Sequence, residues 1–291
     1  MPRGESIPRE PWLRLHSTAL PVNWASMNEL ACIASRDGTP IGYRRLGAGP
    51  GVLIVHGNAS SHEDFLPVAE LLADRFTLTL MDRRGRGLSG PQGAEYSLTK
   101  EREDIEAVLN ATECKFLFGH SFGAIASLET SRHYPVSRLA LYEPPVGLKP
   151  TLDRFMPDFI EAVNGEDYKR AYLILIQGLD VMQADEKLDW YLENVIMPDP
   201  VAWERLVQLI KATEKEAAVA GAYHLPDDAS SLATKMLLLV GDQTPAFIRR
   251  GADLVIKAFP GMEVVTLEGQ GHTAQATAPD LLAGALASFF G

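Results

Sequence analysis

Short apolar runs and longer amphipathic segments alternate along most of the chain. The apolar runs that predict strands lie at residues 52–55, 76–81, 115–118, 139–142, 236–240 and 264–267, and the continuous run 52–55 is typical of a strand buried on both faces of a sheet. The segments with apolar residues at helical spacing lie at 65–72, 97–111, 122–134, 246–258 and 279–289. Strands that alternate with helices in this way predict an α/β fold, a mostly parallel twisted sheet flanked by helices on both faces.

The start of the chain departs from this alternation. Residues 30–35 and 41–46 flank the turn signal Arg36-Asp37-Gly38-Thr39 and predict an antiparallel hairpin. Residues 1–14 are polar and interrupted by prolines, and they lack the apolar core of a signal peptide. We expect an irregular N-terminal arm over residues 1–28.

A second departure lies between two predicted strands, at residues 148–225. The stretch is helical by pattern, and Asp199-Pro200 is typical of an N-cap followed by proline at the first helical position. A helical insertion of this kind predicts a lid (cap) domain over 148–225, with the core formed by 29–147 and 226–291. Trp190 and Tyr191 in this insertion are candidates for lining a substrate pocket.

The composition limits the possible partners of the protein. Hydrophobic residues make up 46% of the 291 positions and charged residues 22%, as in ordinary globular proteins. The formal net charge of −11 argues against broad binding to nucleic acids or anionic membranes, and no apolar run is long enough to span a bilayer. We expect a cytoplasmic protein that acts on a small-molecule substrate, with no nucleic-acid or membrane partner. The sequence leaves its oligomeric state open.

The two cysteines, Cys32 and Cys114, do not indicate a metal site. Neither lies in a CxxC pattern or in a cluster of cysteines and histidines. No metal and no organic cofactor is therefore expected.

The most specific motif is Gly119-His120-Ser121-Phe122-Gly123, which follows an apolar run and precedes a helical segment. A serine on a tight turn between a strand and a helix adopts a strained backbone, and glycine two residues before and after leaves room for it. The turn exposes the hydroxyl, and the N-terminus of the following helix offers N–H groups to a developing oxyanion. Ser121 is therefore the candidate nucleophile.

A serine hydroxyl needs an adjacent base to act as a nucleophile at neutral pH. His272 lies in Gly269-Gln270-Gly271-His272, directly after the last predicted strand. Glycines in that loop allow it to carry an imidazole over the serine. We expect His272 to be the base, and we expect His120, inside the turn itself, to point elsewhere.

Taken together, these motifs resemble the α/β-hydrolase superfamily over residues 30–290. The resemblance rests on His56-Gly57-Asn58, on Asp82-Arg83-Arg84-Gly85-Arg86-Gly87-Leu88-Ser89, on the serine turn and on the Gly-Gln-Gly-His loop. It implies that the backbone N–H groups of Asn58 and Phe122 form the oxyanion hole. It also implies a structural role for His56, and a fold-building role without chemistry for Asp82 and the loop after it.

The carboxylate that orients the base is less clear from the sequence. Similar enzymes often carry it three residues beyond a glycine that ends the strand before the histidine strand, a position that Thr244 occupies here. Asp242 lies two positions earlier and is the alternative acid. Glu143 follows another predicted strand, at the sheet edge where α/β proteins place their sites. Some haloalkane dehalogenases and the zearalenone lactonases look like this, and we expect Glu143 to be the acid.

These residues predict a serine hydrolase that cleaves an ester or lactone through an acyl-enzyme. The apolar and aromatic content of the insertion predicts a medium-sized, partly apolar substrate. Epoxide hydrolysis and dehalogenation are disfavoured, because relatives with those activities carry Asp where this chain has Ser121. The alternatives are hydrolysis of a carbon–carbon bond in a diketone-type substrate and a ligand-binding protein with little turnover.

Overall fold

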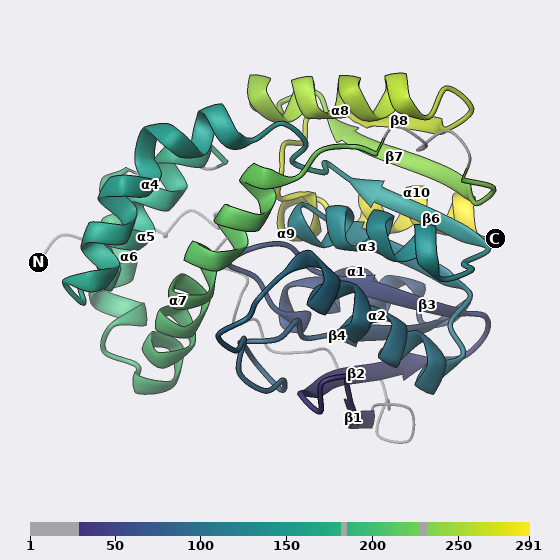
Figure 1. The fold of residues 1–291 in the computed structure, drawn as a ribbon, viewed down its shortest axis with the longest axis horizontal. Coiled ribbons are helices and arrows are strands. Elements are labelled where there is room, and N and C mark those ends of the chain that lie inside the picture. The colour runs from purple at the N-terminus through teal and green to yellow at the C-terminus, as the bar shows by residue number, and fades with distance from the viewer. Residues whose placement is uncertain (1–28, 182–184, 227–231) are drawn as a thin grey trace, which may run out of the picture.

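A computed structural model describes residues 29–181, 185–226 and 232–291 (Figure 1). The arm expected over residues 1–28 lies outside the described residues. The strands are β1 (Glu29–Ala34), β2 (Pro40–Gly47), β3 (Gly51–Val55), β4 (Thr77–Met81), β5 (Phe116–His120), β6 (Arg138–Tyr142), β7 (Lys235–Gly241) and β8 (Glu263–Leu267). The helices around them are η2 (His62–Phe65), α1 (Leu66–Leu72), α2 (Leu98–Thr112), α3 (Phe122–His133), α8 (Ala246–Ala258), α9 (Ala274–Thr277) and α10 (Pro279–Phe290).

The described residues form one eight-stranded sheet in the order β1-β2-β4-β3-β5-β6-β7-β8. The hairpin strands β1 and β2 are antiparallel, and β3 to β8 run parallel to one another. The prediction of a mostly parallel sheet flanked by helices is confirmed. Because the strands from β3 to β8 are parallel, their carboxyl ends and the loops that follow them meet at one edge of the sheet.

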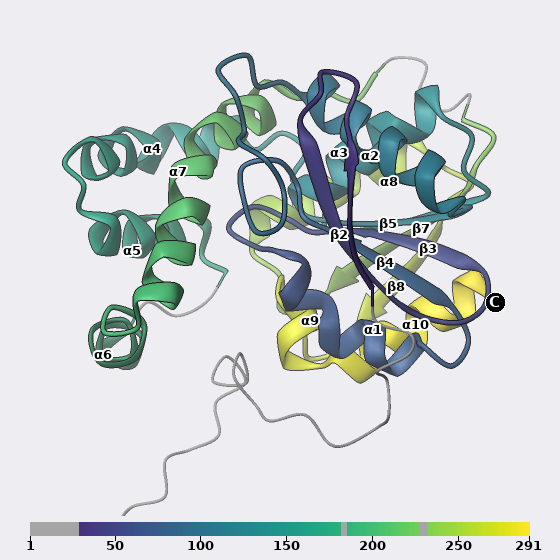
Figure 2. The same cartoon turned by 90° about the horizontal axis from the view of Figure 1, so that it is seen from below.

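Two apolar layers hold the helices on the sheet, because successive side chains of a strand point to opposite faces. Figure 2 shows α2, α3 and α8 on one face and α1 and α10 on the other. The strand residues that pack under the first group include Leu53, Val55, Leu117, Leu139, Leu141 and Leu238. The strand residues that pack under the second group include Val52, Ile54, Phe118, Ala140, Leu237 and Leu239. This burial on both faces explains the continuous apolar runs of the sequence.

The segment between β6 and β7 is helical where the structure describes it, and it lies beside the sheet in both views (Figures 1 and 2). It consists of α4 (Lys149–Asn164), α5 (Tyr168–Leu179), α6 (Glu186–Tyr191), the π-helical turn η3 (Leu192–Ile196) and α7 (Pro200–Ala222). Asp199 caps α7, since its carboxylate accepts from the N–H groups of Val201 and Ala202 at 2.9 and 3.2 Å. We call this segment the helical insertion.

The helical insertion is joined to the core by apolar and charged contacts. Phe122 of the core packs in the apolar cluster of the insertion, with Leu152 of α4 and Ile210 of α7 among its members. Fully buried Glu216 of α7 pairs with the guanidinium of Arg83 at 3.2 Å. A charge buried in this way stays ionised only when it is paired, so the contact fixes the position of α7 on the core.

None of the described helices combines the length and the apolarity of a membrane span.

Candidate active site

The loops at the carboxyl ends of the parallel strands bring the candidate residues together. Asn58 follows β3, Ser121 follows β5, Glu143 follows β6 and His272 follows β8. Asn58, Ser121 and His272 line one pocket, together with Phe122. Residues far apart in the sequence therefore share one site because their strands end at the same edge of the sheet.

Ser121 adopts the strained backbone that its motif predicts. Its φ of 52° and ψ of −124° lie outside the regions that most residues with a side chain occupy. A Cβ on Gly119 would lie 2.5 Å from the carbonyl oxygen of Gly123, and a Cβ on Gly123 would collide with the carbonyl oxygens of Val55 and His56. The close approach of the backbone at these positions explains the two glycines of the motif.

The imidazole of His272 faces the carboxylate of Glu143. Its Nδ1 lies 2.6 Å from Glu143 Oε2, and the carboxylate is completely buried. A carboxylate only accepts hydrogen bonds, so Nδ1 carries the proton and Nε2 is left as the acceptor of the neutral ring. An imidazole in this tautomer can take a proton from a serine hydroxyl.

Glu143 is held by further donors at its second oxygen. Oε1 accepts from the backbone N–H of Gly241 at 2.7 Å and from the hydroxyl of Thr244. Thr244, at the position where similar enzymes often carry the acid, thus donates its hydroxyl to a carboxylate that follows the neighbouring strand. Because both oxygens of the buried carboxylate accept hydrogen bonds from the protein, these bonds replace the ones that it would make with water.

Asp242 occupies a different environment. Its side chain is exposed at the turn between β7 and α8. Its backbone is engaged, with the N–H donating to the carbonyl of Leu267 at 3.3 Å and the carbonyl accepting from Arg249 at 2.8 Å. The structure therefore brings Glu143, and not Asp242, to the imidazole of His272.

The loop that carries His272 is fixed by two buried side chains. Sequence reasoning assigned no role to Tyr142 and expected His120 to point elsewhere. His120 Nε2 donates to the backbone carbonyl of His272 at 2.9 Å, and the two rings lie 4.7 Å apart. The hydroxyl of Tyr142 donates to the carbonyl of Gly271 and accepts from the N–H of Ala274 at 3.2 Å. The sequence feature that could have indicated this role is that His120 and Tyr142 end two central strands, β5 and β6.

Both side chains are neutral near physiological pH. Burial, assisted by the nearby His272, lowers the pKa of His120 well below its ordinary value. Burial also raises the pKa of Tyr142 above its ordinary value, and the adjacent Glu143 adds to the shift. The histidine loop is therefore held by uncharged donors and acceptors.

The two residues expected to stabilise an oxyanion lie beside Ser121. Phe122 is the first residue of α3, so its N–H has no partner within the helix. Asn58 lies after β3, and its side-chain Oδ1 is 2.7 Å from the hydroxyl of Thr213 on α7. The helical insertion thus contacts one of the two expected donors directly.

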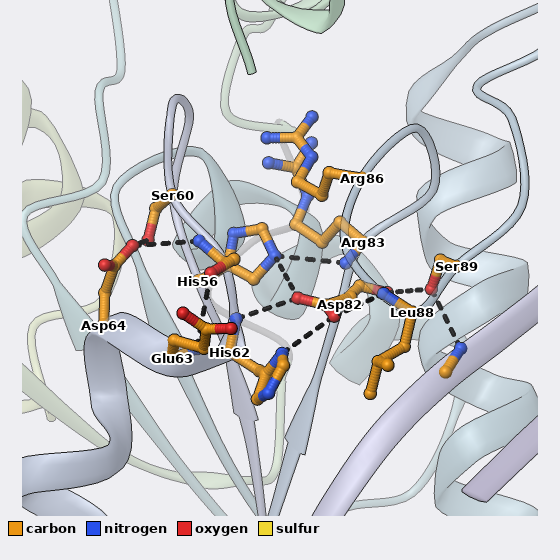
Figure 3. Close-up of polar contacts among 12 residues, drawn as sticks. His56, Ser60, His62, Glu63, Asp64, Asp82, Arg83, Arg86, Leu88 and Ser89 are labelled. Atoms are coloured by element: carbon orange, nitrogen blue, oxygen red, sulfur yellow. Dashed lines mark hydrogen bonds and ion pairs between the residues drawn. The ribbon is translucent and has the colours of Figure 1, made fainter. Parts of the chain in front are cut away.

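A buried polar cluster supports the turn that carries Asn58 (Figure 3). Asp82 accepts from the backbone N–H of His62 and from its ring Nδ1, both at 2.8 Å. His56 Nε2 accepts from the N–H of Arg83 at 3.1 Å, and burial lowers the pKa of His56 well below its ordinary value. The residues of this cluster join the loops after β3 and β4.

Within the described part of the chain, no group of three or more His, Cys, Asp or Glu side chains could hold a metal ion.

The expected pocket residues of the insertion need a correction. Trp190 is 58% exposed, and neither Trp190 nor Tyr191 lines the pocket. Leu188 of their helix α6 packs with Ile176 of α5 and Leu192 of η3. The residues of the insertion that do line the pocket include Leu148, Leu152, Leu175, Leu179, Ala217 and Ala220.

Comparison with known proteins identifies solved structures that share this architecture. A solved α/β hydrolase from Sphaerobacter thermophilus is similar to 90% of this chain and 100% of its own, with 30% identity and a TM-score of 0.74. An esterase from Exiguobacterium antarcticum is similar to 89% of this chain and 98% of its own, with a TM-score of 0.71 and 19% identity, and shows the same fold.

Among curated proteins, a 2-(acetamidomethylene)succinate hydrolase from Mesorhizobium japonicum is 35% identical over 97 residues, which are 33% of this chain and 35% of that protein. The chain thus matches only about a third of the length of the first curated relatives. The model of the alpha/beta hydrolase family matches residues 52–285, from β3 to α10. On that match and on the strand order of its sheet, the chain belongs to the alpha/beta hydrolase family.

Proposed function

We propose that this hydrolase cleaves esters or lactones, with Ser121 as nucleophile, His272 as base and Glu143 as the acid that orients it. The observation that carries the proposal is the hydrogen bond from His272 Nδ1 to buried Glu143, beside a serine on a strained turn. Such a bond holds the imidazole in the tautomer that accepts a proton at Nε2, and it stabilises the imidazolium that forms.

The proposed reaction has two halves. His272 removes the proton of the Ser121 hydroxyl as Oγ attacks the substrate carbonyl, and the N–H groups of Asn58 and Phe122 stabilise the oxyanion. The tetrahedral intermediate expels the alcohol, which takes the proton from His272, and an acyl-enzyme is left. Water, deprotonated by His272, then attacks the acyl-enzyme, and the acid leaves as Ser121 regains its proton.

The helical insertion is the proposed lid of this site. Leu152 of α4, Leu175 of α5 and Ala217 of α7 line the pocket that Ser121 and His272 also line. Most of that lining is apolar, which supports a medium-sized, partly apolar substrate. The proposed reaction needs no metal and no organic cofactor.

A substrate panel tests the proposed reaction. Purified protein is incubated with aliphatic esters, with lactones and with a diketone-type substrate, and the acids released are measured by pH-stat and mass spectrometry. We expect turnover of esters or lactones. Cleavage of the diketone alone would favour the carbon–carbon alternative, and binding without turnover would favour a ligand-binding protein.

The contact between Thr244 and Glu143 gives a prediction about activity. The substitution Thr244→Val keeps the shape of the side chain but removes a hydrogen bond to a buried carboxylate, and we expect kcat to fall about tenfold or more. Thr244→Ser keeps the hydroxyl and serves as the matched control, with most of the activity retained. Equal activity of the two variants across the pH profile of kcat would contradict the positioning role of Thr244.

A further inference from the structure

The pocket beside Ser121 is lined by neutral side chains. Among the described residues that line it, none is Lys, Arg, Asp or Glu, and His272 is the one titratable group. The polar groups gather near the proposed reacting atoms, at Ser121, His272, Asn58 and Thr213. The remainder of the lining is apolar, so the pocket has one polar end and an apolar remainder.

The wall that the helical insertion contributes is mainly aliphatic. Leu152 comes from α4, Leu175 and Leu179 from α5, and Ala217 and Ala220 from α7. Ala217 and Ala220 are three residues apart on one helix, so they present the same face to the pocket. Saturated side chains of this kind offer dispersion contacts and no hydrogen-bond partner to a ligand.

A cation does lie behind this lining, but it is already paired. The guanidinium of Arg83 stacks on the ring of Phe122, with its carbon 4.3 Å from the ring centroid. It pairs at 2.8 Å with Glu101 and at 3.2 Å with Glu216, both fully buried. Glu216 also pairs with a second buried guanidinium, that of Arg86, so two carboxylates face two cations. Phe122 lines the pocket, whereas neither arginine does.

A carboxylate that entered this pocket would lose its hydration and gain no cationic partner. Such burial is among the most costly in proteins, whereas an alkyl chain gains free energy when it leaves water. We infer that the pocket selects substrates whose acyl group is uncharged and aliphatic and rejects acyl groups that carry a carboxylate. This inference rests on the proposed ester or lactone hydrolysis and names its substrate class.

Three chromogenic esters test the selection by charge. They are p-nitrophenyl hexanoate, the p-nitrophenyl monoester of adipic acid, and the methyl p-nitrophenyl diester of adipic acid. The diester matches the monoester in polarity along the chain but has no charge. We expect kcat/KM to be at least about 100-fold lower for the monoester than for either neutral ester.

The outcomes of this comparison are distinct. Similar kcat/KM values for all three esters would overturn the inference and leave the proposed function standing. If the protein hydrolysed none of the three esters, and no ester or lactone of the panel above, the proposed function would fail and the inference with it. A low value for both adipate esters would show that the pocket rejects the terminal carboxyl or ester group whatever its charge, and would also overturn the inference.

A charge introduced into the wall gives the reverse test. Leu179 is half-buried at the end of α5, so an arginine there can rest its stem on the wall and direct its guanidinium into the pocket. We expect Leu179→Arg to raise the ratio of kcat/KM for the monoester over the diester at least tenfold. Leu179→Gln, similar in polarity but uncharged, should leave that ratio near its original value.

A second position protects this test against a folding failure. Val181 also lines the pocket and is half-buried, so Val181→Arg replaces the first variant if that one does not fold. Circular dichroism and the melting temperature decide which variant is used. An unchanged ratio in a folded arginine variant would overturn the inference.

Discussion

Replacement of Ser121 by alanine is expected to lower kcat for any ester or lactone substrate by at least about 10⁴-fold. Alanine keeps the Cβ and removes only the hydroxyl that would attack the substrate. No acyl-enzyme can then form, and the activity that is left comes from the oxyanion donors and from binding. Steady-state kinetics with the best substrate of the panel measures this effect.

A control is available on the adjacent helix. Ser127 of α3 is fully buried and does not line the pocket, so Ser127→Ala should retain activity. Both variants should show the far-ultraviolet spectrum of the wild type, because Ser121→Ala keeps the same backbone strain at φ 52°. More than a hundredth of the original kcat in Ser121→Ala would speak against a serine nucleophile.

Replacement of Glu143 by glutamine is expected to lower kcat by about 10²- to 10⁴-fold. The amide of glutamine has nearly the shape of the carboxylate, but it carries no charge to stabilise an imidazolium. It can also donate a hydrogen bond to Nδ1 of His272, which stabilises the tautomer that cannot accept a proton at Nε2. The loss should therefore appear in kcat more than in KM.

Asp242→Asn is the matched comparison for this variant. The side chain of Asp242 is exposed, and the change also replaces a carboxylate by an amide of the same shape. We expect its kcat to stay within about twofold of the wild type, as for most exposed substitutions. A larger loss of kcat in Asp242→Asn than in Glu143→Gln would indicate that the acid is Asp242, after β7, and not Glu143.

The fold could be predicted from the sequence because the spacing of apolar residues follows directly from which side chains are buried. Strands β3 to β6 are covered on both faces and appear as apolar runs, while the predicted helix at 246–258 coincides with α8. The hairpin was readable from its turn residues, and β1 pairs with β2 in register across that turn. These features depend on local sequence and on one pattern of burial.

The choice of acid required information that the sequence does not hold. Glu143 and Asp242 both follow predicted strands, and both precede His272 in the chain. The pairing of β6 with β7 brings Gly241 and Thr244 to the buried carboxylate of Glu143. In the sequence Thr244 appeared as a departure from the common pattern. In the structure its hydroxyl donates to the carboxylate of Glu143, which we propose as the acid.

Contacts between distant segments were the hardest to foresee. The aromatic residues of α6 were selected for their chemistry, but Trp190 lies exposed because the helix packs against α5 and η3. His120 and Tyr142 were missed because their role depends on a loop more than 120 residues later, and the hydrogen bonds of Tyr142 span 129 and 132 positions. Localisation in the cytoplasm stays a prediction, and the oligomeric state stays open.

Covalent labelling of the native protein tests the central claim most directly. A fluorophosphonate reacts with an activated serine, whose oxygen displaces fluoride and forms a stable phosphonate ester. We predict that one probe molecule is added per chain, that peptide mapping places it on Ser121, and that heat-denatured protein is not labelled. A native protein that stays unlabelled, or that carries the probe at another residue, would contradict the assignment of Ser121 as the activated nucleophile.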